Sequence, residues 1–196
     1  MIHAYHCIFG VYGFWLPNDP RGSWSDFVRT WELLRFGEAT KVSGRRSLAQ
    51  KPHDHKLRLA AKEALMYPPV LFTGVQAQSV GLGFKHAIER SGYVLYACAI
   101  LPDHVHAVIA RPRYHIEYVV GQLKGEATKR LKQDGLHPLA CYAGCPSPWA
   151  QKGWNVYLND EEAIIRAIQY VEDNPLKEDK PRQNWSFVTR YIRDLG

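Results

Sequence analysis

The stretch ILPDHVHAVIA, residues 100–110, places two histidines one residue apart inside an apolar run. Side chains alternate between the two faces of a β-strand, so residues i and i+2 point the same way. His104 and His106 therefore share one face, and Val105 lies on the other. Two imidazoles held side by side on one strand are a pattern typical of half of a metal site. Taken alone, the pair also fits two partly buried histidines that are satisfied by hydrogen bonds.

A second β-rich run, YVLYACAIL at residues 93–101, precedes the histidine pair, and Pro102-Asp103 between the two runs predicts a hairpin. Apolar spacing and composition predict the other elements: strands within 2–15 and over 153–158, and helices over 75–92, 115–135 and 161–174. The order is strand, helix, strand, strand, helix, strand, helix. This order predicts an antiparallel sheet with helices packed on it, in the α+β class.

The composition is that of one globular domain spanning residues 1–196, with 46% hydrophobic residues to build a core. The formal net charge of +6 favours a polyanionic partner such as nucleic acid. No run reaches the roughly 18 apolar residues of a membrane span, and the first residues lack the basic region of a signal peptide. We therefore expect a cytoplasmic protein with no membrane partner.

The four cysteines are too few and too irregularly spaced for a disulfide framework. His137, Cys141 and Cys145 raise the question of a zinc site, but they offer at most three ligands and no second Cys-x-x-Cys pair. We expect an ordinary loop there. Cys7 and Cys98 lie in apolar runs and are expected to be small core residues.

The second informative stretch is AIQYVEDNPLK, residues 167–177. Tyr170 and Asn174 are four residues apart, so they lie on one face of a helix, one turn from each other. An asparagine offers an amide oxygen to a metal, and a tyrosine offers a phenol as a nucleophile. Together with His104 and His106, Asn174 would complete three protein ligands and leave positions open for a substrate phosphate, as metal-assisted phosphoryl chemistry requires. Nitrogen and amide oxygen ligands are compatible with Mg²⁺ or Mn²⁺.

Each of these residues also has a structural interpretation. Tyr170 fits the apolar spacing of a core aromatic, and Asn174 fits the end of a helix before Pro175. Tyr118 and Gln122 repeat the spacing of a tyrosine and an amide on another helix, and Tyr118 is therefore a competing nucleophile.

The chain resembles the single-tyrosine HUH transposases of bacterial insertion sequences, and most closely their REP-associated relatives. Four segments carry the resemblance in the family's order and cover roughly residues 3–190: WLPNDPRGSW at 15–24, ILPDHVHAVI at 100–109, QLKGEATKRL at 122–131 and YVEDNPLK at 170–177. The second segment departs from the family's Leu-Met-Pro-Asn-His-Val-His by having Leu-Pro-Asp before the histidines. A lone His-x-His would be weak evidence, but the ordered set is specific.

The resemblance implies a ferredoxin-like antiparallel sheet with helices packed on one face. It implies that His104, His106 and Asn174 bind a divalent metal, and that Tyr170 attacks a phosphodiester of single-stranded or hairpin DNA. The product would be a 5′-phosphotyrosine link with a free 3′-hydroxyl. The protein would be a bacterial enzyme, associated with the nucleoid when bound to DNA, and monomer and homodimer are equally open.

Basic residues supply the candidates for DNA contact: Arg21, Lys124, Lys129, Arg130 and Lys132. Residues 33–70 look like a basic insertion, longer than the family's, and fit either a solvated surface or an arm that contacts DNA. Residues 176–196 form a C-terminal extension.

Two rival functions remain open from the sequence. One is a DNA-binding protein of the same fold that no longer cuts, and the other is a metal-dependent nuclease in which water attacks in place of Tyr170. A histidine-triad hydrolase would want a third alternating histidine, but position 108 is valine.

Overall fold

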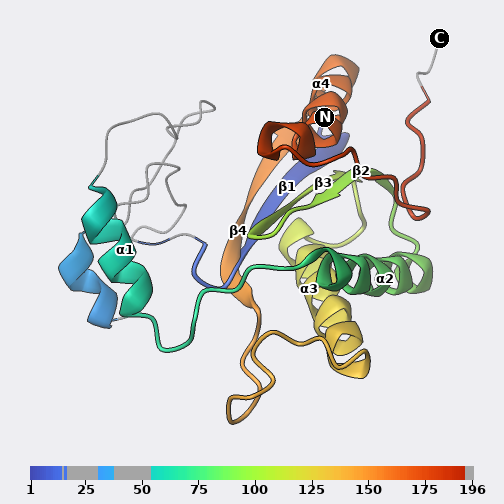
Figure 1. Ribbon diagram of the computed structural model, residues 1–196. Helices are drawn as coiled ribbons and strands as arrows, with labels where there is room; N and C mark the ends of the chain where they lie inside the picture. Colours follow the sequence, from blue (N-terminus) through green and yellow to red (C-terminus); the bar gives the residue numbers. More distant parts are fainter. Residues whose placement is uncertain (15, 17–30, 38–53, 193–196) are drawn as a thin grey trace.

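A computed structural model describes residues 1–14, 16, 31–37 and 54–192 of the chain. Its centre is a four-stranded antiparallel sheet in the order β2-β3-β1-β4 (Figure 1). The strands are β1 (Ala4–Val11), β2 (Leu95–Ile100), β3 (His104–Ala110) and β4 (Trp149–Leu158). With one long helix just before β2 and another between β3 and β4, the chain contains the β-α-β-β-α-β order of a ferredoxin-like fold, and a shorter helix is added after β1. The α+β class and the β2–β3 hairpin are confirmed.

The two helices of this β-α-β-β-α-β unit, α2 (Gly74–Ser91) and α3 (Ile116–Gln133), cover one face of the sheet (Figure 1). Thr73 caps α2 in a capping box with Gln76, and Gly92 ends it in the left-handed conformation with φ of 66°. The main core lies between these helices and the sheet, where Phe9, Phe84 and Leu123 are fully buried. Burial of this apolar surface is the main source of stability for the fold.

The last α-helix, α4 (Glu161–Asp173), packs on the opposite face of the sheet (Figure 1). Its Ile164 and Val171 lie against Ala99 and Val108 in a second, smaller core. The expectation that the helices pack on one face is therefore wrong for α4. The physical reason is that β3 is buried on both faces, since neighbouring strand residues point to opposite sides and both sides carry apolar residues.

Within the predicted insertion at 33–70, the described parts form a 3₁₀ turn η1 (Trp31–Phe36) and the helix α1 (His55–Glu63). Leu33, Phe36 and Ala61 bury each other in a third small cluster, so these parts have a core of their own. Residues 38–53 lie outside the described residues.

After α4 the chain makes a second 3₁₀ turn, η2 (Pro175–Glu178), and then runs along the outer edge of β2. The Gln183 side chain donates to Ile100 O and accepts from Ile100 N, both at 2.8 Å, and Thr189 N donates to Leu95 O. The predicted C-terminal extension thus satisfies backbone groups of an edge strand that would otherwise be open to pairing with another chain.

A buried carboxylate links α2 to α3. Glu126 of α3 is 6% exposed and accepts from Arg90 of α2 and from Lys129, at 3.0 and 2.8 Å, while His86 of α2 lies 3.0 Å from its second oxygen. These partners, Lys129 first, hold the pKa of Glu126 at about 2.

In the described part of the chain, the helices are all too short or too polar to cross a lipid bilayer.

Candidate active site

The two histidines of β3 lie on the face of the sheet that α4 covers. His106 is 4% exposed, and the His104 side chain is 13% exposed. Their Nε2 atoms are 3.0 Å apart, with the two ring planes nearly perpendicular at 78°. The alternation of strand side chains therefore brings the pair together as the sequence predicts.

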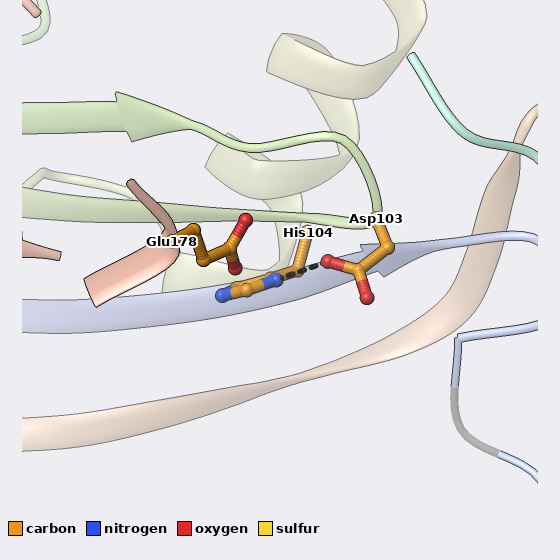
Figure 2. A group of neighbouring side chains, drawn as sticks. All are labelled: Asp103, His104 and Glu178. Atoms are coloured by element: carbon orange, nitrogen blue, oxygen red, sulfur yellow. Dashed lines mark hydrogen bonds and ion pairs between the residues drawn. The ribbon is translucent and has the colours of Figure 1, made fainter. Parts of the chain in front are cut away.

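Asp103 fixes the tautomer of His104. Its carboxylate lies 2.6 Å from His104 Nδ1 (Figure 2). An ionised carboxylate only accepts hydrogen bonds, so Nδ1 carries the proton and a neutral His104 has its lone pair on Nε2. Asp103 is therefore both part of the β2–β3 turn and a direct partner of His104.

His6 of β1 contacts His106, and the sequence pattern does not predict this contact. Its Nε2 lies 3.0 Å from His106 Nδ1. In the register of the sheet His106 pairs with Ile8, and the next residue on the same face of β1 is His6. Burial lowers the pKa of His6 to about 4. Burial also lowers the pKa of His106 well below its usual value, and His104, His6 and Lys177 add to this effect. Both rings are therefore neutral at neutral pH, the state in which imidazole binds metals.

The end of α4 brings Asn174 to the histidine pair. Asn174 is 6% exposed, follows the last residue of the helix, and has its Nδ2 3.3 Å from His106 Nε2. The two ends of an amide have almost the same shape, so a half-turn of the group presents Oδ1 at this place.

Tyr170, one turn earlier, remains 43% exposed. Its ring lies edge-on to His106 and His6, with centroids 5.5 and 5.7 Å apart. Burial raises the pKa of the Tyr170 phenol, and a hydrogen bond with Asn174 opposes the rise. Lys177 places its ammonium 3.8 Å from the centre of the Tyr170 ring. The nucleophile candidate is thus open to solvent while the ligand candidates beside it are buried.

The donor set fits a divalent cation. Two ring nitrogens bound at right angles to one ion at about 2.1 Å lie about 3.0 Å apart, and the two Nε2 atoms show this separation. Glu178 of η2, which the sequence pattern also does not predict, holds its carboxylate beside the His104 ring (Figure 2). Ligand atoms of Asp103, His104 and Glu178 lie within 4.8 Å of one another. The cluster therefore offers imidazole nitrogen, amide oxygen and carboxylate oxygen, which suit Mg²⁺ and Mn²⁺.

The competing tyrosine lies elsewhere. Tyr118 is on α3, which covers the opposite face of the sheet, and its hydroxyl accepts from Gln122 Nε2 at 2.7 Å. Gln122 Oε1 in turn accepts from Ser91 and Tyr93. This pair belongs to the contacts between α2 and α3, and the structure does not bring it to His104 and His106.

The basic candidates on α3 are also away from the histidine pair. Lys124 is half-buried and donates to Ala150 O at 2.8 Å, and burial lowers its pKa to about 8. Lys129 and Arg130 are paired with Glu126 and with a carboxylate in the next turn, and Lys132 is exposed. Arg21 lies outside the described residues. A role for these residues in DNA binding stays a prediction.

The loop at residues 137–145 brings together two of the three zinc-ligand candidates in it, His137 and Cys145. Cys145 Sγ lies 3.3 Å from His137 Nδ1, whereas Cys141 is exposed. Among the residues that the structure describes, Asp103, His104 and Glu178 form the one group of three His, Cys, Asp or Glu side chains close enough to share an ion.

Comparison with known proteins gives a family match. Residues 68–174, more than half of the chain, match the family model described as "Transposase IS200 like". This range contains His104, His106, Tyr170 and Asn174, but not His6 or Glu178. No curated protein sequence matches the chain.

Two solved structures are similar over most of their length. One is a REP-associated tyrosine transposase bound to a REP hairpin, with 11% identity, a TM-score of 0.48, and coverage of 97% of this chain and 93% of that one. The other is a candidate transposase from Deinococcus radiodurans R1, with 14% identity, a TM-score of 0.43, and coverage of 92% and 93%.

Proposed function

The chain belongs to the IS200-like transposase family, and from this premise we propose that it nicks and rejoins single-stranded DNA through a covalent bond to Tyr170. Transposition of DNA is the activity that family membership supports. The proposal adds the nucleophile, the metal ligands and the form of the DNA.

The observation that carries the proposal is the convergence of distant residues on one face of the sheet. His104 and His106 come from β3, and Tyr170 and Asn174 come from the end of α4. They meet with contacts of 3.0 Å between the histidines and 3.3 Å between Asn174 and His106, and Tyr170 packs edge-on to the His106 ring. Active sites of this kind are recognised by such mutual geometry.

In the proposed reaction the Tyr170 hydroxyl oxygen bonds to the phosphorus of a phosphodiester. The bond from phosphorus to the 3′ oxygen breaks, and that oxygen leaves as a hydroxyl with the proton that the phenol loses. The strand downstream of the break stays linked to Tyr170 through its 5′ phosphate as a phosphotyrosine, and the reverse reaction with another 3′-hydroxyl rejoins a strand. A bound Mg²⁺ or Mn²⁺ supplies polarisation of the scissile phosphate.

The residues of the chain each have a part in this reaction. His104, His106 and Asn174 would hold the ion, and Glu178 would add a carboxylate beside His104. The exposed ammonium of Lys177 lies over the Tyr170 ring, where it would attract the phosphate backbone. The fixed position of Tyr170 on α4 lowers the entropic part of the barrier, because the attacking oxygen is already oriented.

The test uses single-stranded DNA hairpins labelled at the 5′ or the 3′ end, incubated with the protein and Mn²⁺ or Mg²⁺ and analysed on denaturing gels. The proposal expects a covalent adduct that carries the 3′ label, because Tyr170 is joined to the 5′ phosphate of the strand downstream of the break, and a free shorter fragment that carries the 5′ label. The adduct should disappear with EDTA and in Tyr170→Phe and His106→Ala, and persist in Tyr118→Phe, a matched change on the other face of the sheet.

Two outcomes would contradict the proposal. Cleavage without an adduct that survives Tyr170→Phe would mean that water attacks, as in a metal-dependent nuclease. Binding without cleavage across a wide panel of hairpins and single strands would mean a DNA-binding protein that does not cut.

A further inference from the structure

We propose that His6 is a positioning residue for the metal site: its hydrogen bond to His106 Nδ1 fixes the ring so that Nε2 points at the ion. The inference rests on the proposed function, because it takes His104 and His106 as metal ligands. His6 lies outside the family match at residues 68–174, and its neighbour in this bond is 100 residues away in the sequence.

The position of His6 follows from the sheet. β1 is a central strand between β3 and β4, and the register places His6 and Ile8 opposite Val108 and His106. His6 is 9% exposed, and its ring lies 5.2 Å from the His106 ring at an interplanar angle of 31°. A buried side chain on a central strand has little freedom to move, so it holds its partner in one orientation.

His6 completes a chain of four side chains. The links run from His6 Nε2 to His106 Nδ1 at 3.0 Å, from His106 Nε2 to His104 Nε2 at 3.0 Å, and from His104 Nδ1 to Asp103 at 2.6 Å. Each link needs one proton between its two atoms. Without an ion, His6 Nε2 donates to His106, His106 Nε2 donates to His104, and His104 Nδ1 donates to Asp103, with the Asn174 amide turned so that Oδ1 faces His106 Nε2.

An ion bound to both Nε2 atoms requires a different arrangement of the same protons. His106 must then carry its proton on Nδ1, and His6 Nε2 must accept it. In this change His106 Nε2 releases one proton to solvent, His106 Nδ1 takes the proton of His6 Nε2, and His6 Nδ1 takes one proton from solvent. The number of protons on the protein is unchanged.

A neutral imidazole suits this place because the same nitrogen either donates or accepts, depending on the tautomer. A carboxylate at position 6 would only accept, and it would leave a buried negative charge without an ion. His6 therefore satisfies His106 Nδ1 both with and without the metal.

The first measurement is Mn²⁺ binding by electron paramagnetic resonance, which reads free Mn²⁺ directly and needs no DNA. His6→Phe removes the hydrogen bond and keeps a ring against Tyr170, and it should weaken Mn²⁺ binding by about 10- to 100-fold. His6→Gln, with an amide that donates or accepts, should lose less. His106→Ala should abolish binding, and His3→Phe, at an exposed site just before β1, should match wild type.

Imidazole nitrogen NMR of the wild type, with and without Mg²⁺, is the second measurement. Mg²⁺ should move the proton of His106 from Nε2 to Nδ1 and that of His6 from Nε2 to Nδ1. This readout stands even if His6→Phe fails to fold, as judged by circular dichroism, and unchanged tautomers of both rings in the Mg²⁺-loaded protein would overturn the inference.

The outcomes separate this inference from the proposed function. A wild type that binds no Mn²⁺ would overturn both. A folded His6→Phe that binds Mn²⁺ as tightly as wild type, while His106→Ala does not bind, would overturn the role of His6 alone.

Discussion

Gly83 in the middle of α2 should be intolerant of even one methyl group. A Cβ built there lies 2.5 Å from Ala127 Cα and 2.8 Å from Glu126 O, both backbone atoms of α3. Carbon atoms pack at about 3.5–4.0 Å, so α2 and α3 would have to separate by about 1 Å. Backbone atoms cannot rotate away, which puts the overpacking cost at about 3 kcal/mol, the upper end of its usual range. The better helix propensity of alanine offsets about 1 kcal/mol of this cost.

The net expectation is that Gly83→Ala lowers the free energy of unfolding by about 2 kcal/mol. For a protein of this size that is a fall in Tm of about 4–8 °C. Gly125→Ala on α3 is the matched control, because its Cβ would meet nothing within 4 Å. The control should raise Tm by about 2–4 °C through helix propensity alone. Thermal and urea unfolding measure both variants, and a Gly83→Ala protein as stable as wild type would refute the close approach of the two helices.

Three further predictions concern charged side chains. Lys177→Gln should weaken single-stranded DNA binding and reduce its salt slope by about 1, because one phosphate contact is lost. Lys85→Gln, at a partly exposed lysine on α2 that is paired with Glu89, should leave both the affinity and the salt slope unchanged in fluorescence anisotropy titrations. Glu178→Gln should weaken Mn²⁺ binding about tenfold by removing one ligand charge, and equal Mn²⁺ affinity in resonance titrations would exclude its carboxylate from the site. Glu126→Gln should lower the free energy of unfolding by about 2 kcal/mol at pH 7. Because the folded pKa of Glu126 lies at about 2, below its ordinary 4.5, the stabilisation is present above pH 4.5 and is lost as the pH falls to 2. Urea unfolding should therefore show the gap to wild type closing over this range, and a gap that stays constant from pH 7 to pH 3 would contradict the ion-pair explanation.

Local signals explain why the sequence predicts the helices and strands and also the four site candidates His104, His106, Tyr170 and Asn174. Proline and aspartate mark the β2–β3 turn, Gly92 ends α2, and Pro175 ends α4 just after Asn174. The His-x-His and Tyr-x-x-x-Asn spacings each depend on the geometry of a single element, which is why they could be read directly.

His6 and Glu178 are not predicted by local sequence patterns, because their positions in the site depend on tertiary contacts. His6 is a single histidine in an apolar strand, and only the pairing of β1 with β3 brings it to His106. Glu178 reaches His104 because η2 turns the chain back after α4. The face of the sheet on which α4 packs also depends on tertiary structure, because β3 is buried on both faces. The alternation of side chains in one strand does not show which helix covers which face.

The placement of α4 on its own side of the sheet gives the two site residues of this helix opposite environments. Asp160 caps its first turn, and Val171 is fully buried against the sheet, so the helix is held at both ends. Asn174 comes after the last turn and is 6% exposed, whereas Tyr170 is 43% exposed. Metal ligands benefit from burial, because fewer waters compete for the ion and the ligands keep their geometry. A nucleophile for DNA must instead reach a long, charged substrate from outside. A helix that ends at the histidine pair meets both requirements with residues four positions apart, and this geometry is a physical reason for the proposed nucleophile and the proposed third ligand to share one helix.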